Sequence, residues 1–171
     1  MQIKKYGVEL NRMTVSDLEM VRQWRNATHV RTAMEYQNHI DEQMQETWYN
    51  TLDAERDYYF IISQGSEKAG VVNLKNADGV EAEAGIFIGE KKFLNTLVPV
   101  AATLVVMEFA FDELGLEKLK AKIAQNNLRA IRFNEALGYK IRGDESGKFV
   151  YYSVTKPGFY EATHKFRDVL R

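Results

Sequence analysis

The sequence predicts an α/β fold of the α+β type, in which a mixed, mostly antiparallel sheet carries helices packed on it. Two stretches lead to this prediction. Val80–Ile88 (VEAEAGIFI) alternates two sets of side chains, as a strand does, and Leu97–Met107 is apolar nearly all the way round, as a buried helix is. The predicted elements follow in the order β, α, α, β, β, β, α, β, α, β, β, which we interpret as a single domain over residues 1–171.

The first third of the chain is predicted to form one strand and two helices. Residues 6–12 (YGVELNR) make the strand, and a helix opens at Ser16, which fits a capping box with Glu19. Three apolar residues of this helix fall at helical spacing: Leu18, Val21 and Trp24. Four others recur at every fourth position and predict a second, amphipathic helix: Ile40, Met44, Trp48 and Leu52.

Three strand signals in succession predict an antiparallel meander. Tyr58–Ile62 is aromatic and β-branched, Ala69–Lys75 follows a first turn, and Val80–Ile88 follows a second. The third of these strands should present different residues on its two faces. One face carries Glu81, Glu83, Gly85 and Phe87, and the other carries Ala82, Ala84, Ile86 and Ile88.

Helices and strands alternate in the second half of the chain. A helix is expected to begin with Thr96 as its N-cap, to hold Pro99 in its first turn and to end before Gly115. The elements after it are, in order, a strand at Lys118–Ala124, a helix at Asn127–Leu137, a pair of strands at Tyr139–Arg142 and Phe149–Thr155, and a tail with weak helical periodicity at Pro157–Arg171.

Charge and composition exclude several classes of function. Lysine and arginine total 23 against 24 aspartate and glutamate, so we expect neither nucleic acid nor a membrane surface as a partner. No cysteine is present, which excludes disulfides and cysteine nucleophiles. The N-terminus lacks the apolar core of a signal peptide and Leu97–Met107 is too short to span a bilayer, so we expect a cytoplasmic protein. The histidines are isolated, so no metal site is expected: His29, His39 and His164.

Two stretches resemble a known family. Asn127–Tyr139 (NLRAIRFNEALGY), preceded by the alternating strand Lys118–Ala124, is similar to the strand-then-helix signature N-x-x-A/S…G-F of the GNAT superfamily of N-acetyltransferases. Glu81–Ile88, followed by a loop and a helix that ends in Phe109–Leu114, looks like the fourth strand, pyrophosphate loop and third helix of that family. The resemblance covers essentially the whole chain. It implies a sheet of about six or seven strands, splayed between strands 4 and 5, with about four flanking helices.

A third stretch resembles one branch of this family. Trp24–Asn26 and Val30–Arg31, followed by Met34, Ile40 and Trp48, are spaced as in the branch that acetylates ribosomal-protein N-termini and amino-sugar nucleotides, and closer to the amino-sugar enzymes. The resemblance implies acetyl-CoA-dependent transfer to a small-molecule primary amine within a ternary complex, by a monomer or homodimer. Two alternatives stay open: a protein N-terminus or polyamine as acceptor, and a non-catalytic acyl-CoA-binding module.

The resemblance also implies which residues hold acetyl-CoA. The pantetheine arm would pair with the backbone of Phe87, Ile88 and Gly89, and the diphosphate would be held at the following helix N-terminus. The residues at that position are Leu94, Asn95, Thr96 and Leu97, and those expected on the later helix are Asn127, Ala130 and Phe133.

The pyrophosphate loop departs from the family pattern. Phe93–Pro99 contains none of the glycines that let the backbone approach a phosphate closely. Three interpretations follow: the loop binds phosphate along a different backbone path, it binds CoA weakly, or the chain has lost catalysis. Lys91 and Lys92 could compensate by their charge, although two adjacent lysines are commonly just solvated.

Candidate catalytic groups come from the same comparison. An alkylammonium must lose a proton before it can attack, and Glu83 stands where several family members place a glutamate for that purpose, with Glu81 as the alternative on the same face. A backbone N–H near Ile88 would stabilise the oxyanion. The tyrosine with which many members protonate the leaving thiolate is replaced by Asn134. Asn134 could hydrogen-bond the sulfur or a water, and the proton would come from water or from another side chain such as Tyr139.

The resemblance also implies that the acceptor lies against the end of the first helix. Arg25 and Arg31 suit a phosphate-bearing acceptor, because a guanidinium pairs with phosphate through two hydrogen bonds. Asn26 and Glu81 are further candidates for acceptor contacts, whereas Trp24 is expected in the core.

Overall fold

The computed structural model describes residues 1–170, and of residues 144–146 the backbone alone. Eight strands of this part of the chain form one sheet, in the spatial order β1-β2-β3-β4-β5-β6-β8-β7. Neighbouring strands are antiparallel except for the parallel pair β5 and β6, so the predicted mixed, mostly antiparallel sheet is confirmed. The strands are β1 (Gln2–Lys5), β2 (Val8–Arg12), β3 (Tyr58–Gln64), β4 (Glu67–Lys75), β5 (Glu81–Ile88), β6 (Lys118–Ala124), β7 (Lys140–Ser146) and β8 (Phe149–Thr155).

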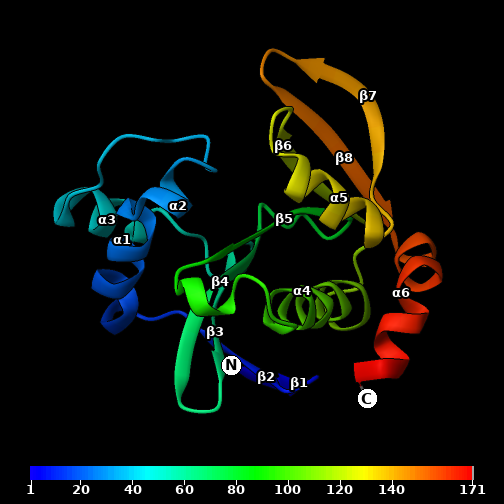
Figure 1. Ribbon diagram of the computed structural model, residues 1–171, viewed down its shortest axis with the longest axis horizontal. Helices are drawn as coiled ribbons and strands as arrows, with labels where there is room; N and C mark the ends of the chain where they lie inside the picture. Colours follow the sequence, from blue (N-terminus) through cyan, green and yellow to red (C-terminus); the bar gives the residue numbers. More distant parts are fainter. Residues whose placement is uncertain (171) are drawn as a thin grey trace.

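Six α-helices of the described residues cover the two faces of this sheet. Figure 1 shows α1, α2 and α3 together on one side of β3 and β4, with α4 and α6 on the other side. The helices are α1 (Leu18–Asn26), α2 (Thr28–Arg31), α3 (Glu42–Asn50), α4 (Val98–Glu108), α5 (Leu128–Ala136) and α6 (Lys156–Leu170). The tail that had only weak helical periodicity is therefore helical up to Leu170, and Arg171 lies outside the described residues.

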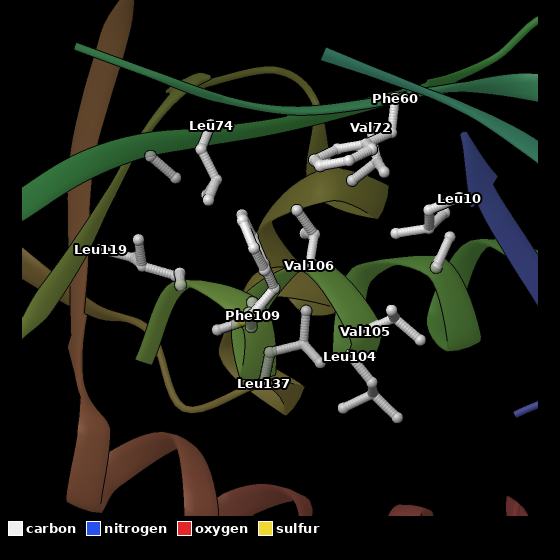
Figure 2. Packing of buried hydrophobic residues seen from close by; sticks show 14 of the residues in the cluster. Leu10, Phe60, Val72, Leu74, Leu104, Val105, Val106, Phe109, Leu119 and Leu137 are labelled. Carbon is white, nitrogen blue, oxygen red and sulfur yellow. The ribbon is translucent and has the colours of Figure 1, made fainter. Parts of the chain in front are cut away.

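The larger hydrophobic core lies between the sheet and α4, which is buried as predicted. Figure 2 shows Phe60 of β3 and Val72 and Leu74 of β4 pointing toward Val105 and Val106 of α4. All five of these side chains are at most 2% exposed. Residues of α5 pack against the same cluster, which places α5 on the α4 side of the sheet.

The smaller core lies on the opposite face, under α1. Val21 and Trp24 of α1 pack there against Ile61 of β3 and Val71 of β4, with Trp48 of α3 at the edge. The prediction that Trp24 belongs to the core is confirmed, because its side chain is 7% exposed. On this face the helices cover β3 and β4, while the face of β5 and β6 carries charged side chains.

The predicted meander of three strands is confirmed, and the prediction for the N-terminus is wrong in one respect. Tyr6 lies in a turn rather than in a strand, because Tyr6 and Gly7 both have positive φ angles (55° and 75°), as a tight hairpin requires. The hairpin adds β1 to the sheet. The Tyr6 hydroxyl donates to the buried Glu108 carboxylate of α4 (2.7 Å), and Lys5 pairs with the same group (2.6 Å). Such a tertiary contact cannot be predicted from the local pattern.

Two predicted helix ends also differ from the structure. The capping box involves Thr14 and Asp17, whose carboxylate accepts from the Thr14 N–H (3.0 Å), instead of Ser16 and Glu19. At α4 the N-cap is Leu97, and Thr96 acts from one position earlier by accepting from the Val98 N–H (3.2 Å). The end of this helix widens into a π-helix over Phe109–Glu113.

The parallel pair β5 and β6 separates along its length. Their register joins Glu81 to Lys118, Ala82 to Leu119 and Glu83 to Lys120, and no pairing follows among the described residues. From Ala84 to Ile88, β5 is therefore paired on its β4 side only, and an opening begins between β5 and β6.

Candidate active site

The backbone of β5 turns unpaired groups into the opening toward β6. The Gly89 N–H donates to the Ala69 carbonyl of the β4 strand (2.9 Å). Backbone groups alternate in direction along an antiparallel strand, so Phe87 and Gly89 turn toward β4 while Ile86 and Ile88 turn toward β6. Of the three residues predicted to pair with pantetheine, the structure therefore brings Ile88 to the opening, and Phe87 and Gly89 face the other strand.

Gly89, at the end of β5, packs directly against α1. A Cβ atom at Gly89 would lie 2.2 Å from the ring of Trp24, so only glycine lets α1 approach the end of β5 this closely. The Trp24 indole N–H donates to the carboxylate of the next residue, Glu90 (2.9 Å). This contact fixes α1 against the end of β5, beside the opening.

His29 of α2 reaches the same edge and was not predicted there. Its Nε2 atom lies 3.2 Å from the Ile88 carbonyl oxygen, and its Nδ1 atom is buried without a hydrogen-bond partner in the described residues. Nothing in the local sequence marks this histidine, because its contact depends on how α2 sits over β5.

The two carboxylates of β5 differ in their ion pairing. Glu81 is held by Lys118 (2.7 Å) and Lys120 of β6, and hydrogen bonds from these two lysines lower the pKa of its carboxyl. Glu83 pairs with the single cation Lys75 of β4 (2.9 Å), and its side chain is 32% exposed. Glu81 is therefore a weaker base than a carboxylate without such partners, since a lower pKa reduces its affinity for a proton.

A half-buried guanidinium lies over Phe87, and none of the described side chains pairs with it as an anion. The Arg25 guanidinium lies 5.8 Å from the centre of the Phe87 ring, and the described groups offer it neither an ion pair nor a hydrogen bond. Burial lowers the pKa of Arg25, an effect that Tyr59 opposes. An unpaired charge in such a place is unfavourable in the free protein, which makes Arg25 a candidate for binding an anion.

Two further polar groups, missed by the sequence analysis, lie in one row across the sheet near Arg25. The register aligns Tyr59 of β3 with Asn73 of β4 and Asn73 with Gly85 of β5. Neither the Tyr59 hydroxyl nor the Asn73 amide has a hydrogen-bond partner in the described residues. A Cβ atom at Gly85 would lie 3.0 Å from the Asn73 amide oxygen, so the glycine leaves room above the strand.

The remaining acceptor candidates have different surroundings. Asn26 exchanges two hydrogen bonds of 2.8 Å with the backbone of Ile40, so its side chain holds the segment that joins α2 to α3. From that segment Glu35 reaches across to Lys122 of β6 (2.6 Å). Arg31 is half-buried, and its guanidinium has no hydrogen-bond or ion-pair partner among the described residues. Asn26 is thus a structural residue, and Arg31 stays a candidate.

The loop between β5 and α4 folds into short turns that use some of its amides. The Leu94 N–H donates to the Lys91 carbonyl (3.1 Å) and the Thr96 N–H donates to the Phe93 carbonyl (3.3 Å). The N–H groups of Asn95 and Leu97 have no partner among the described groups. Of the four predicted phosphate contacts, Asn95 and Leu97 therefore offer free backbone donors.

A second guanidinium lies at this loop. Arg129 of α5 donates to the Leu94 carbonyl and lies 3.3 Å from the Asn95 side-chain oxygen. The two lysines considered for the loop differ: Lys92 pairs with Glu67, and Lys91 is exposed. The positive charge next to the free amides therefore comes from Arg129, which is 34 residues from Asn95 in the sequence.

The match to known families decides the classification. Residues 8–140 match the family model described as an acetyltransferase (GNAT) domain. The chain belongs to the GNAT acetyltransferase family. A curated relative, the uncharacterized protein MJ1062 of Methanocaldococcus jannaschii, is 24% identical over 150 residues, and the match covers 80% of this chain but only 30% of the relative's length.

Solved GNAT structures share the fold. One is described as apo FdhC, a nucleotide-linked sugar GNAT; it has a TM-score of 0.82 and 20% identity, and the alignment covers 100% of this chain and 99% of that one. Another is the spermidine N-acetyltransferase of Vibrio cholerae in complex with CoA and spermine, with a TM-score of 0.77 and 16% identity, covering 90% of this chain and 98% of that one. The observed sheet and helices are thus those of a GNAT fold.

Residues of α5 that the GNAT resemblance singled out have defined contacts. The Asn127 side-chain oxygen accepts from the Ala130 N–H (3.1 Å), so Asn127 caps this helix. Asn134, at the place of the usual tyrosine, donates to the Ala130 carbonyl (2.8 Å), and Phe133 packs against the larger core. Tyr139 is 3% exposed inside that core, where burial raises the pKa of its hydroxyl. Tyr139 is therefore badly placed to protonate a thiolate.

The described residues hold neither a metal cluster nor a membrane span. Their side chains include no group of three or more His, Asp or Glu that could hold a metal ion. No helix within residues 1–170 is long and apolar enough to cross a membrane.

Proposed function

We propose that this protein is an acetyl-CoA-dependent N-acetyltransferase that transfers the acetyl group directly to a primary amine in a ternary complex. The observation that carries the proposal is the opening between β5 and β6, where the backbone groups of Ile86 and the N–H of Ile88, all unpaired by a strand, lie next to the carboxylate face of β5. An extended pantetheine arm can pair with such a strand edge. The membership of the GNAT family supports acetyl-CoA as the acyl donor.

The transfer needs one base and one oxyanion donor. Glu83 takes a proton from the alkylammonium, directly or through water, because an amine of pKa about 10 is protonated at neutral pH. The amine nitrogen then attacks the thioester carbonyl carbon, and the Ile88 N–H donates to the oxyanion that forms. As the tetrahedral intermediate collapses, the C–S bond breaks and the nitrogen loses its second proton. That proton reaches the thiolate through water, because Asn134 bonds within its own helix and Tyr139 is buried.

The diphosphate of CoA would lie at the loop before α4. The free amides of Asn95 and Leu97 and the guanidinium of Arg129 can donate to it together. Arg129 would thereby replace the close backbone approach that glycines give elsewhere in the family. Of the three interpretations of the glycine-free loop, this arrangement favours phosphate binding along a different backbone path.

The acceptor that fits best is an amine that also carries a negative charge, such as an amino-sugar nucleotide. The acceptor face carries five cationic side chains (Arg25, Lys75, Lys118, Lys120 and Lys122) against three carboxylates (Glu35, Glu81 and Glu83). This excess of positive charge attracts an anionic acceptor. The likeness in fold to a nucleotide-linked sugar GNAT agrees with this choice.

A polyamine is the second candidate, because the chain also shares its fold with a spermidine N-acetyltransferase. A polyamine is a cation, and the same excess of positive charge would repel it. The two candidates therefore predict opposite preferences. A thiol-release assay with acetyl-CoA should show turnover on a nucleotide-linked amino sugar at concentrations where spermidine is a poor acceptor. Faster turnover of spermidine would contradict the anionic acceptor, and turnover of no amine would favour a non-catalytic acyl-CoA-binding module.

A further inference from the structure

A pocket of about 430 Å³ lies between α3, the segment that follows it, and strands β2 and β3. Its walls come from Arg12, Met13, Tyr49, Leu52, Ala54, Asp57 and Tyr59. The pocket is distinct from the opening between β5 and β6. It lies on the same face of the sheet as Glu83, because Tyr59 and Glu83 both point to the face that α1 and α3 partly cover.

Tyr59 joins the pocket to the candidate active site. Burial raises the pKa of Tyr59 to about 12, with the negative charges of Asp57 and Glu83 acting in the same direction and Arg25 opposing them. The phenol is therefore within electrostatic reach of one residue of the pocket and of two residues at the candidate site. Its ring is held edge-on against Trp48, with the ring centres 5.1 Å apart. Tyr59 thus forms a fixed wall shared by both regions.

The charged side chains of the pocket are already satisfied by the protein. The Arg12 guanidinium donates to the carbonyls of Asp57 (2.6 Å) and Ala54 (3.0 Å). The Asp57 carboxylate accepts from the N–H groups of Asp53 (3.0 Å) and Asn76 (2.9 Å). These bonds make the wall rigid before any ligand binds. The groups left for a ligand are aromatic and aliphatic surfaces, together with the Tyr59 hydroxyl.

Such a lining suits a planar ring with polar edges. Tyr49 and Tyr59 offer aromatic surfaces, and Met13 and Leu52 are apolar. Ring-on-aromatic contacts of this kind stabilise bound heteroaromatic bases without demanding one particular base. A saturated polyamine chain would gain little from the same walls.

The spacing along the sheet matches an acceptor with three parts. Tyr59 lies two strands away from Glu83 and is offset from it by two residues along the strands. With strands about 4.8 Å apart, the backbones of Tyr59 and Glu83 are therefore about 12 Å apart. Arg25 lies on the Phe87 side of Tyr59, because its guanidinium sits over Phe87 and interacts with Tyr59. An amine at Glu83 and a ring beyond Tyr59 would therefore lie about 12 Å apart, with Arg25 beside Tyr59 to meet an anionic linker.

We propose that this pocket binds the heteroaromatic ring of a nucleoside diphosphate to which the acceptor amine is attached. The proposal rests on the proposed function, because it assigns the far end of the acceptor whose amine meets Glu83. It also explains why Tyr59 and Asn73 present unpartnered polar groups between the two regions. The nucleoside diphosphate alone, without its sugar, should then bind to the protein.

The test measures binding of uridine diphosphate and thymidine diphosphate by isothermal titration calorimetry. Ala54→Trp fills the pocket from an exposed position and leaves the backbone contact to Arg12 in place. Ser66→Trp, in the exposed turn at the far end of β3, is the matched control. The wild type and the control should bind a nucleoside diphosphate with affinities within about twofold of each other, and the filled variant should show no binding.

The affinity for acetyl-CoA, measured on the same samples, distinguishes a failure of the pocket assignment from a failure of the proposed function. It should be equal in the wild type and both tryptophan variants, which also shows that they are folded. Tyr49→Ala provides a second variant that enlarges the pocket instead of filling it, and it should weaken nucleoside diphosphate binding about tenfold by loss of ring stacking. Normal acetyl-CoA binding without any binding of nucleoside diphosphate would overturn the pocket assignment alone, as would unchanged binding to Ala54→Trp. Loss of acetyl-CoA binding in the wild type would instead overturn the proposed function.

Discussion

Glu83 and Lys75 lie opposite each other on β5 and β4, and their side chains form an ion pair of 2.9 Å at the edge of the opening between β5 and β6. The lysine keeps the carboxylate oriented on the acceptor face. Two residues earlier, Glu81 is held by two lysines instead of one. This difference favours Glu83 for the proposed role of base and makes Glu81 its natural control.

Replacing Glu83 by glutamine removes the proposed base without changing the shape of the side chain. We expect Glu83→Gln to lower kcat at neutral pH by about 10²–10⁴-fold, because the acceptor amine would stay protonated. The dissociation constant of acetyl-CoA, measured by calorimetry, should not change. Glu81→Gln serves as the control and should lower kcat far less. Equal losses in the two variants would remove the distinction between these carboxylates.

Arg129 should contribute to acetyl-CoA binding through the diphosphate. We expect Arg129→Ala to weaken acetyl-CoA binding by about tenfold, as the loss of a charge-assisted hydrogen bond would. Binding of acetyl-pantetheine, which has no phosphate, should be unaffected. Arg132→Ala removes the same charge one turn later on α5, where the side chain is exposed, and should have little effect on either ligand. An equal loss of affinity for both ligands in Arg129→Ala would show that Arg129 only shapes the loop.

Arg25 should determine the preference for an anionic acceptor. In Arg25→Ala we expect KM for a nucleotide-linked amino sugar to rise about tenfold or more, because a guanidinium that pairs with phosphate is lost. KM for spermidine should stay the same or fall, since a positive charge has been removed. Steady-state kinetics with both acceptors measure the two effects. A matching rise in both KM values would indicate that Arg25 supports the structure and does not bind the negative charge of the acceptor.

The ionisation of the Tyr59 hydroxyl as the pH is raised tests whether this side chain is buried. Its folded pKa of about 12 lies above the usual value of 10.0, so the folded state keeps its proton where the unfolded state loses it. The stabilisation from this shift is complete below pH 10 and is lost as the pH rises toward 12. The near-ultraviolet difference titration of wild type minus Tyr59→Phe should therefore show no phenolate until well above pH 10. A phenol that ionises at its ordinary pKa would contradict the buried position beside Asp57 and Glu83.

Much of the fold could be predicted because the relevant signals are local. The alternation in β5 placed Glu81, Glu83 and Phe87 on one face, and the same signal gave β6 its bounds at Lys118–Ala124. Because apolar residues surround α4 on nearly all sides, the sequence predicted that this helix is buried. Each of these properties depends on residues a few positions apart.

The parts of the candidate site that were missed depend on contacts between distant segments. Tyr59 and Asn73 meet Gly85 only through the register of three strands, and Arg129 reaches the loop before α4 only after α5 has packed. His29 carries no signal in the sequence, because α2 is a single short turn whose position over β5 is set by α1.

The most direct test of the central claim is amide hydrogen exchange along β5 with and without acetyl-CoA. If pantetheine pairs with this strand edge, saturating acetyl-CoA should slow exchange at Ile86 and Ile88, whose N–H groups face the opening. Exchange at Gly85 and Phe87, which face β4, should change little. Unchanged exchange at Ile86 and Ile88 under saturating acetyl-CoA, or protection of all four amides alike, would contradict the assignment of this opening as the acyl-CoA site.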